Sequence, residues 1–148
     1  MDSRSTATLF ERLKNLLRAR ANHHQPNHPQ TSRQWTGRQG EALAESFLRN
    51  EGYQILARNW RSGRSEVDLV ARERDILVFV EVKTRHPDDL VGGYAAMNQR
   101  KRSALRRAAN AWMAKAVPRP LTHRLDLVEV RLAPGIEPVI RHYSNLPF

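Results

Sequence analysis

The chain has 148 residues, of which 25 are Lys or Arg and 15 are Asp or Glu, so its formal net charge is +10. This length is typical of one domain, and so basic a surface favours a polyanionic partner such as nucleic acid over a merely soluble basic protein. The absence of cysteine excludes disulfides and thiolate metal sites, and no apolar run reaches the roughly 18 residues that span a bilayer. We expect a cytoplasmic protein with no membrane-spanning segment.

Residues 1–34 differ in composition from the rest of the chain. Within them, residues 6–21 have leucines at helical spacing and predict a short basic amphipathic helix, which could contact nucleic acid, a membrane surface or a partner. Residues 22–34 are polar and contain proline, which is typical of a disordered linker. We therefore expect 1–34 to be an extension and 35–148 to form the compact domain. Three histidines in the extension could bind a metal, but a flexible segment favours no such role: His23, His24 and His28.

From residue 37 onward the hydrophobic pattern switches between the periods of helices and strands. A tight turn at Arg74 and Asp75 joins the second and third strands, and Pro138 interrupts the last strand, which favours a place near a sheet edge. The order α-β-β-β-α-β-β predicts an α/β sandwich around a mixed sheet. The predicted elements are helix 37–52, strands 53–60, 66–72 and 76–83, helix 97–116, and strands 123–132 and 136–143.

Both predicted helices have an apolar stripe that should face the sheet. Gly52 is expected to end the first helix, and the Pro-Arg-Pro run at 118–120 is expected to end the second. The stripes consist of Leu43, Ala44, Phe47 and Leu48 in the first helix and of Leu105, Ala108, Ala109 and Trp112 in the second.

The segment 65–85, SEVDLVARERDILVFVEVKTR, predicts a hairpin that carries charges inside apolar arms. Side chains alternate between the two faces of a strand, so Glu66 and Asp68 share one face of the first arm, and Glu81 and Lys83 share one face of the second. With the predicted turn, Asp68 lies across from Glu81 and Glu66 lies across from Lys83. A shift of one residue would separate the two sets, so this register is a prediction.

Carboxylates that face each other across a sheet repel, and the arrangement of Asp68 and Glu81 requires compensation. At about 5 Å and an effective dielectric near 20, the repulsion is on the order of 3 kcal/mol. Protonation of one carboxylate would relieve it, and so would a divalent cation bound by both. Segment 65–85 contains no His or Cys, which favours Mg²⁺ or Mn²⁺ over zinc. The competing interpretation is a buried ion-pair triad that also includes Lys83.

Glu41 is a further candidate ligand. It lies at the edge of the apolar stripe of the first helix, from which it could point toward the sheet. The alternative is a negative charge that the helix dipole favours near the N-terminus. The sequence leaves both interpretations open.

This set of side chains suits phosphodiester hydrolysis. A metal held by two carboxylates lowers the pKa of water and stabilises charge on a phosphate, and Lys83 could orient the attacking water or neutralise the intermediate. The second helix carries cations with no acid on the same helix, which favours phosphate contacts over a solvated helix face. The candidate nucleic-acid contacts are Arg85, Arg100, Lys101, Arg102, Arg106 and Arg107.

The spacing of Asp68 and Glu81-Val82-Lys83 resembles the D…ExK signature of restriction-endonuclease-like (PD-D/E-x-K) nucleases. The runs GRQGEALAESFL, GYQILARNWR, SEVDLVA, FVEVKTR and RLDLVEV occur in an order similar to the YraN family of uncharacterised bacterial proteins. That family is regarded as distantly related to archaeal Holliday-junction resolvases. The resemblance covers residues 37–148, with Ser65 where the family's GEID motif commonly has Gly.

This resemblance implies a restriction-endonuclease-like α/β/α fold, with Lys83 as catalytic lysine and Asp68, Glu81, Glu41 and Glu66 as the acids of a Mg²⁺ or Mn²⁺ site. The implied activity is cleavage of structured or branched nucleic acid, with DNA favoured over RNA. Since resolvases act as dimers, a homodimer is also open. Two alternatives remain: a module that binds DNA or RNA without cutting it, and a nucleic-acid-associated assembly factor.

Overall fold

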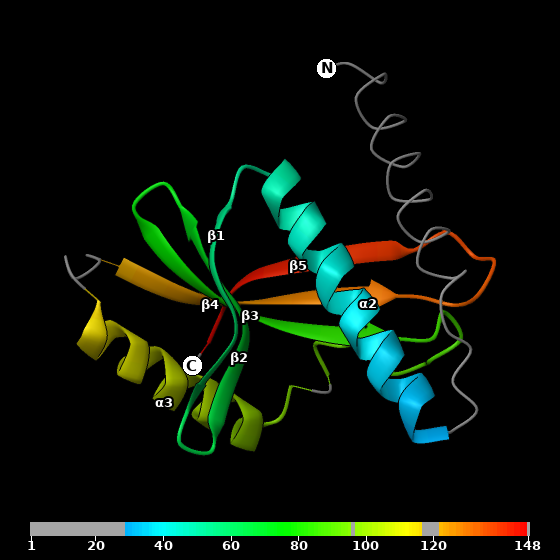
Figure 1. Ribbon diagram of the computed structural model, residues 1–148, viewed down its shortest axis with the longest axis horizontal. Helices are drawn as coiled ribbons and strands as arrows, with labels where there is room; N and C mark the ends of the chain where they lie inside the picture. Colours follow the sequence, from blue (N-terminus) through cyan, green and yellow to red (C-terminus); the bar gives the residue numbers. More distant parts are fainter. Residues whose placement is uncertain (1–28, 96, 117–121, 148) are drawn as a thin grey trace. The chain divides into compact units, whose positions relative to one another are not determined.

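The structure is a computed structural model that describes residues 29–95, 97–116 and 122–147 (Figure 1). The predicted N-terminal helix, the three histidines and the Pro-Arg-Pro run lie outside these residues. Thr36–Phe148 form one compact unit, distinct from Met1–Trp35. No described helix is long and apolar enough to cross a membrane.

A five-stranded mixed sheet forms the centre of the fold, and its strands follow chain order across it. Neighbouring strands are antiparallel except β3 and β4, which are parallel and therefore need a crossover, supplied by helix α3. The observed order confirms the predicted α-β-β-β-α-β-β arrangement and the α/β class. The elements are α2 (Pro29–Asn50), β1 (Gln54–Ser62), β2 (Ser65–Glu73), β3 (Ile76–Arg85), α3 (Gln99–Lys115), β4 (Thr122–Arg131) and β5 (Val139–Leu146).

The two helices cover opposite faces of the sheet. On one face, odd-numbered side chains of β3 and β4 such as Phe79 and Leu127 pack with Leu105 of α3 in the main core cluster. On the other face, Gly40 of α2 lies so close to Thr84 that an added Cβ would be 1.8 Å from the Thr84 hydroxyl. A glycine is needed there because only a bare backbone allows this approach.

The predicted glycine stop of α2 is confirmed, and α3 begins with a side-chain cap. Gly52 adopts a φ of 90°, and the N–H of Tyr53 donates to the carbonyl of Leu48 at 2.9 Å, which completes a Schellman motif after α2. At the start of α3, the Asn98 side chain caps the helix by accepting a hydrogen bond from the N–H of Lys101 at 2.9 Å. These caps fix where each helix stops and starts beside the sheet.

Three details differ from the predictions. Helix α2 begins at Pro29, inside the segment predicted as a linker, and proline suits a first helical turn because its φ is already fixed. Pro138 precedes β5 and does not interrupt it, since proline cannot donate to the ladder, although β5 does lie at the predicted edge. Trp112 is only half-buried and packs edge-on against Trp60, with ring centroids 5.3 Å apart, while Met113 takes a buried position.

Candidate metal and phosphate site

The β2–β3 hairpin has the register predicted from its turn. Residues 69–73 of β2 pair with residues 76–80 of β3 without a shift. Asp68 and Glu81 are the next residues beyond the last pair, so they lie on the same face of the two strands. The geometric condition that the sequence set for a shared site is therefore met.

The Asp68 carboxylate bonds to the neighbouring strand in place of a further ladder pair. Its Oδ2 atom accepts a hydrogen bond from the backbone N–H of Val82 at 2.7 Å. Burial and the negative charge of Glu81 raise the pKa of Asp68 to about 7, against the opposing effects of the Val82 hydrogen bond and the Lys101 charge. The repulsion expected between the two carboxylates is thus present in the folded protein.

Glu81 is more buried than Asp68, and its side chain is 2% exposed. Its Oε1 atom accepts a hydrogen bond from Lys83 Nζ at 2.6 Å and lies 3.0 Å from Lys101 Nζ. Its Oε2 atom is buried and has no hydrogen-bond partner among the described residues. Such an unpartnered oxygen is costly in a protein interior, and it is the kind of atom that a bound cation would satisfy.

Glu41 lies near this pair but already has a partner. Its Oε2 atom accepts a hydrogen bond from Asn59 Nδ2 at 3.2 Å, on a part of β1 where Asn59 has a φ of 48°. The charge of Glu41 still acts on Asp68, since it contributes to the raised pKa of that carboxyl. Glu41 therefore belongs to the electrostatic surroundings of the pair.

Glu66 does not lie opposite Lys83, contrary to the predicted pairing. The β2–β3 ladder ends before Glu66, and its exposed carboxylate pairs with Arg61 of β1 at 3.1 Å. On the other side of β3, Lys83 lies beside Glu129 of the parallel strand β4. Within the described ranges, no three His, Cys, Asp or Glu side chains gather as a metal-binding group, so the structure brings together two of the four predicted acids.

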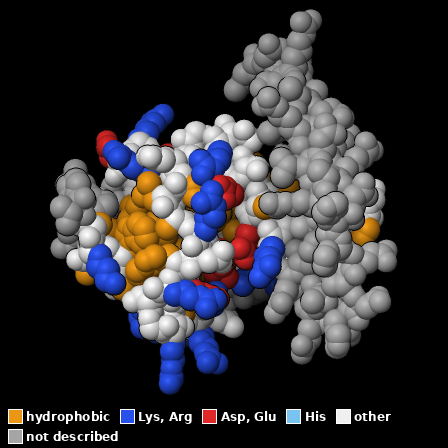
Figure 2. All heavy atoms as spheres, viewed as in Figure 1, with side chains coloured by type: hydrophobic (Ala, Val, Ile, Leu, Met, Phe, Trp, Pro, Cys, Tyr) orange, Lys and Arg blue, Asp and Glu red, His pale blue; other side chains and the backbone are white. Residues whose placement is uncertain are grey.

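Some of the predicted phosphate-binding cations are exposed, and the others contact groups of the protein. Arg100, Arg106 and Arg107 are exposed on α3. Arg102 is half-buried, with its Nε donating to the carbonyl of Met97 at 3.1 Å. Figure 2 shows acidic side chains near the middle of one face, with basic side chains on either side.

Two other predicted contacts are turned toward the protein. Lys101 reaches Glu81, a partner that the acid-free sequence of α3 did not reveal because the acid comes from the sheet. Arg85 has a buried Nε atom without a hydrogen-bond partner in the part of the chain that is described. The exposed arginines therefore remain the cations of this set most available to a phosphate backbone.

Glu129 is a buried acid that the sequence interpretation did not assign. It is fully buried, accepts hydrogen bonds from the backbone N–H of Gly93 and from Arg131 Nε, and is adjacent to Lys83. Burial opposes its ionisation, but the hydrogen bonds from Arg131 and Gly93 outweigh burial and hold its pKa below the ordinary value. Glu129 thus fixes the loop that passes over Lys83.

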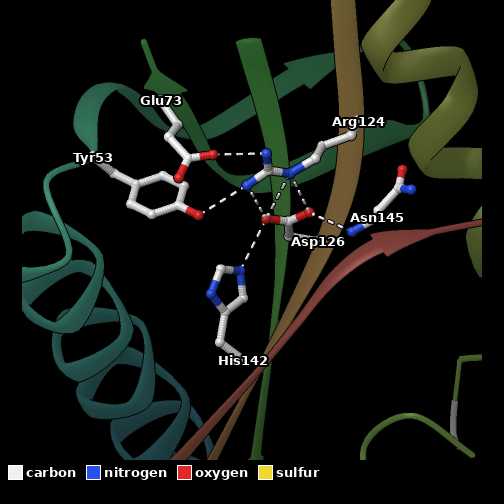
Figure 3. Close-up of polar contacts among 6 residues, drawn as sticks. All are labelled: Tyr53, Glu73, Arg124, Asp126, His142 and Asn145. Carbon is white, nitrogen blue, oxygen red and sulfur yellow. Dashed lines mark hydrogen bonds and ion pairs between the residues drawn. The ribbon is translucent and has the colours of Figure 1, made fainter.

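A second polar network lies on the other face of the sheet (Figure 3). The guanidinium of Arg124 donates to Asp126, to Glu73 at 2.7 Å and to the Tyr53 hydroxyl at 2.8 Å. Asp126 is fully buried and also bonds His142 Nε2 at 2.9 Å. Burial opposes ionisation of Asp126, but the hydrogen bonds from His142 and Arg124 outweigh it and lower its pKa.

This network, defined as Tyr53, Glu73, Arg124, Asp126, His142 and Asn145, borders an open cavity of about 450 Å³. The charged groups of Arg124 and Asp126 are engaged with one another and with neighbouring strands, which is typical of a structural ion-pair network. One sequence signal could have revealed both missed acids. In LDLVEV, Asp126 and Glu129 each have an apolar neighbour on both sides, as Asp68 and Glu81 do in the hairpin.

Comparison with known proteins identifies the family of this chain. The sequence profile of a family described as uncharacterised protein family UPF0102 matches residues 40–130, a segment that contains Asp68, Glu81 and Lys83. A UPF0102 protein of Nocardia farcinica is 42% identical over 110 residues, which cover 74% of this chain and 87% of the relative. A UPF0102 protein of Trichlorobacter lovleyi is 41% identical over 113 residues, or 76% of this chain and 89% of the relative. A UPF0102 protein of Nitratidesulfovibrio vulgaris is 43% identical over 97 residues, which cover 66% of this chain and 72% of the relative. The chain therefore belongs to the uncharacterised protein family UPF0102.

Proposed function

We propose that this protein is a divalent-cation-dependent endonuclease that hydrolyses phosphodiester bonds in structured or branched nucleic acid. The observation that carries the proposal is the buried pair Asp68 and Glu81, on one face of a hairpin, with an unpartnered oxygen and two ammonium groups beside it. A structural ion-pair triad with Lys83 does not account for the buried Oε2 of Glu81, which has no partner among the described residues. Fold alone does not decide activity, so the proposal depends on these side chains.

Asp68 and Glu81 would hold the cation. The residues fit Mg²⁺ or Mn²⁺ because both donors are carboxylates, and the buried Oε2 of Glu81 has no other partner among the described residues. Two acids suffice, since Mg²⁺ is commonly held by one or two carboxylates together with water and substrate phosphate. When bound, such a cation would polarise the scissile phosphate and stabilise the charge that develops on it.

Lys83 would act on the same phosphate. Its ammonium group lies 2.6 Å from Glu81 Oε1, and its side chain is 27% exposed, so it faces the position where a phosphate could approach the acids. From there it would orient the attacking water or neutralise charge on the phosphoryl oxygens. Arg100, Arg106 and Arg107 would hold the nucleic-acid backbone, giving affinity but little sequence preference.

A cleavage assay tests the proposal. The purified protein is incubated with labelled four-way junction, flap, single-stranded and duplex DNA, and with the matching RNAs, in Mg²⁺, Mn²⁺ or EDTA. We expect cleavage with either cation, none with EDTA, and none from Lys83→Met or Asp68→Asn. Lys115→Met removes an exposed charge from the last turn of α3 and should keep activity. Cleavage that persists in both site variants would point to a contaminant and refute the assignment.

The second candidate is a nucleic-acid-binding module without catalysis. The exposed arginines of α3 and the net charge of +10 favour binding whether or not the acids hold a cation. Tight binding with no cleavage under any cation would support this function over the first. DNA as the preferred substrate and a homodimer as the active form stay proposals, which substrate competition and the mass in solution would decide. The assembly-factor hypothesis rests on residues 1–34 and also stays a prediction.

A further inference from the structure

Among the described cations of α3, Lys101 contacts the acidic pair from the helix. Its Nζ atom lies 3.0 Å from Glu81 Oε1, and its side chain is 28% exposed. Glu81 comes from β3 and Lys101 from the first turn of α3, so this ion pair joins β3 to the crossover helix that follows it in the chain. It places a positive charge at the mouth of the site.

The two oxygens of Glu81 are used unequally. Lys83 and Lys101 both contact Oε1, while the buried Oε2 has no hydrogen-bond partner among the residues described. A divalent cation that reaches Oε2 would therefore enter beside two positive charges. In a partly buried site, that repulsion is stronger than it would be in water.

Lys101 also lies among groups that suit a phosphate. It follows the exposed Arg100 in the first turn of α3, a turn with no acidic residue. The amides at a helix N-terminus favour negative charge, and the flexible stem of a lysine allows its ammonium group to move between nearby anions. The same side chain can therefore pair with Glu81 or with a backbone phosphate beside the helix.

We propose that Lys101 is a displaceable counter-ion that makes cation binding and nucleic-acid binding cooperative. Without nucleic acid, Lys101 neutralises Glu81 and weakens cation binding at the pair. When a nucleic-acid backbone lies along α3, Lys101 moves to a phosphate and leaves Glu81 to the cation. The coupling is reciprocal, so a bound cation also strengthens nucleic-acid binding. This inference rests on the proposed function, and Lys101 acts in it as a positioning residue.

The test measures Mn²⁺ affinity, by calorimetry and by the paramagnetic signal of the free ion, so it does not depend on activity. Lys101→Met removes the charge and keeps the length of the side chain. Without nucleic acid, we expect this variant to bind Mn²⁺ on the order of tenfold more tightly than the wild type. Lys101→Arg should retain the wild-type affinity, and Lys115→Met, at the far end of the same helix, should leave it unchanged.

A second arm adds an oligonucleotide with phosphorothioate linkages, which resist hydrolysis. The wild type should then bind Mn²⁺ on the order of tenfold more tightly than it does alone, and Lys101→Met should gain much less. Thermal unfolding of each variant checks that it is folded. If Lys101→Met does not fold, Lys101→Gln replaces it as the variant without the charge.

The outcomes separate this inference from the proposed function. If the wild type binds Mn²⁺ but removal of the Lys101 charge leaves the affinity equal or weaker, Lys101 is a structural ion-pair partner and the inference is wrong. If the wild type binds no Mn²⁺ with or without the oligonucleotide, the metal-dependent function itself fails.

Discussion

Replacing Asp68 by Asn should stabilise the protein at alkaline pH, although it disables the proposed site. Asp68 is mostly buried beside Glu81, and burial together with that charge raises its pKa to about 7 from an ordinary 3.8. The folded state therefore holds a proton that the unfolded state releases above pH 3.8. As the pH rises from 3.8 to about 7, the unfolded state gains more from releasing this proton than the folded state does, so the free energy of unfolding of the wild type falls.

The size of the effect follows from the two pKa values. The difference between a pKa of about 7 and the ordinary 3.8 corresponds to roughly 4 kcal/mol of stability lost when Asp68 is ionised at pH 8. We expect the Asp68→Asn variant to gain about 2–4 kcal/mol at this pH. Asparagine keeps an oxygen that can accept the hydrogen bond from the N–H of Val82 and carries no charge. The gain should therefore approach this range at pH 8 and shrink toward zero as the pH falls to about 4.

Denaturant unfolding between pH 4 and pH 8, with EDTA present, measures this difference directly. Glu51→Gln, which neutralises an exposed carboxylate just after α2, should show no comparable pH dependence. Adding Mg²⁺ at pH 8 should raise the stability of the wild type and not that of Asp68→Asn, since ligand binding stabilises only the state that binds. An Asp68→Asn variant that is less stable at pH 8, or whose gain is the same at every pH, would refute the reasoning.

Three further predictions address the loop, the second network and the helix. Gly93→Ala would place a Cβ 2.8 Å from a buried carboxylate oxygen and should cost about 1–3 kcal/mol in thermal unfolding, whereas Gly92→Ala, whose Cβ would have 3.6 Å to the same oxygen, should cost little. Asp126→Ala should lower the free energy of unfolding by about 3–5 kcal/mol because it leaves the largely buried guanidinium of Arg124 poorly matched. The lowered pKa of Asp126 means that this contribution is present above pH 3.8 and is lost from the wild type as the pH falls further, so a variant that already lacks the carboxylate should lose less in acid. Neutralising Arg106 and Arg107 together should reduce the slope of log affinity against log salt concentration by about 2, and an unchanged slope would mean that these side chains do not contact phosphate.

The fold could be predicted from the sequence because its local signals agree with one another. The helical stripes, the glycine that ends α2 and the tight turn at Arg74 each specify a short stretch of backbone, and together they fix the order of elements. The predicted starts of α2 and β5 are wrong because proline is compatible with a first helical turn and with the residue before a strand, as Pro29 and Pro138 show.

The site could be predicted only as far as contacts within one hairpin reach. Strand parity and the turn specify that Asp68 and Glu81 share a face, since both depend on residues close in the chain. The position of Lys101 against Glu81, and of Glu129 beside Lys83, depends on how α3 and β4 pack on the sheet, which no local pattern encodes. The predicted pairing of Glu66 is wrong for a related reason, because the β2–β3 ladder ends at Leu69 and Val80, before Glu66.

The polar network around Arg124 and Asp126 couples the unfolding of the outer strands to that of the central strands. The outer strands of a sheet ordinarily fray first and exchange their amide protons early. Here Asp126 relies on His142 and the N–H of Asn145, both on β5, while Arg124 relies on Tyr53 just before β1. Local unfolding of β5 or of the start of β1 would leave Asp126 or Arg124 without some of its partners. Both outer strands should therefore unfold only together with the central strands of the sheet. Amide protection should therefore extend to the outer strands, and unfolding should be a single cooperative event.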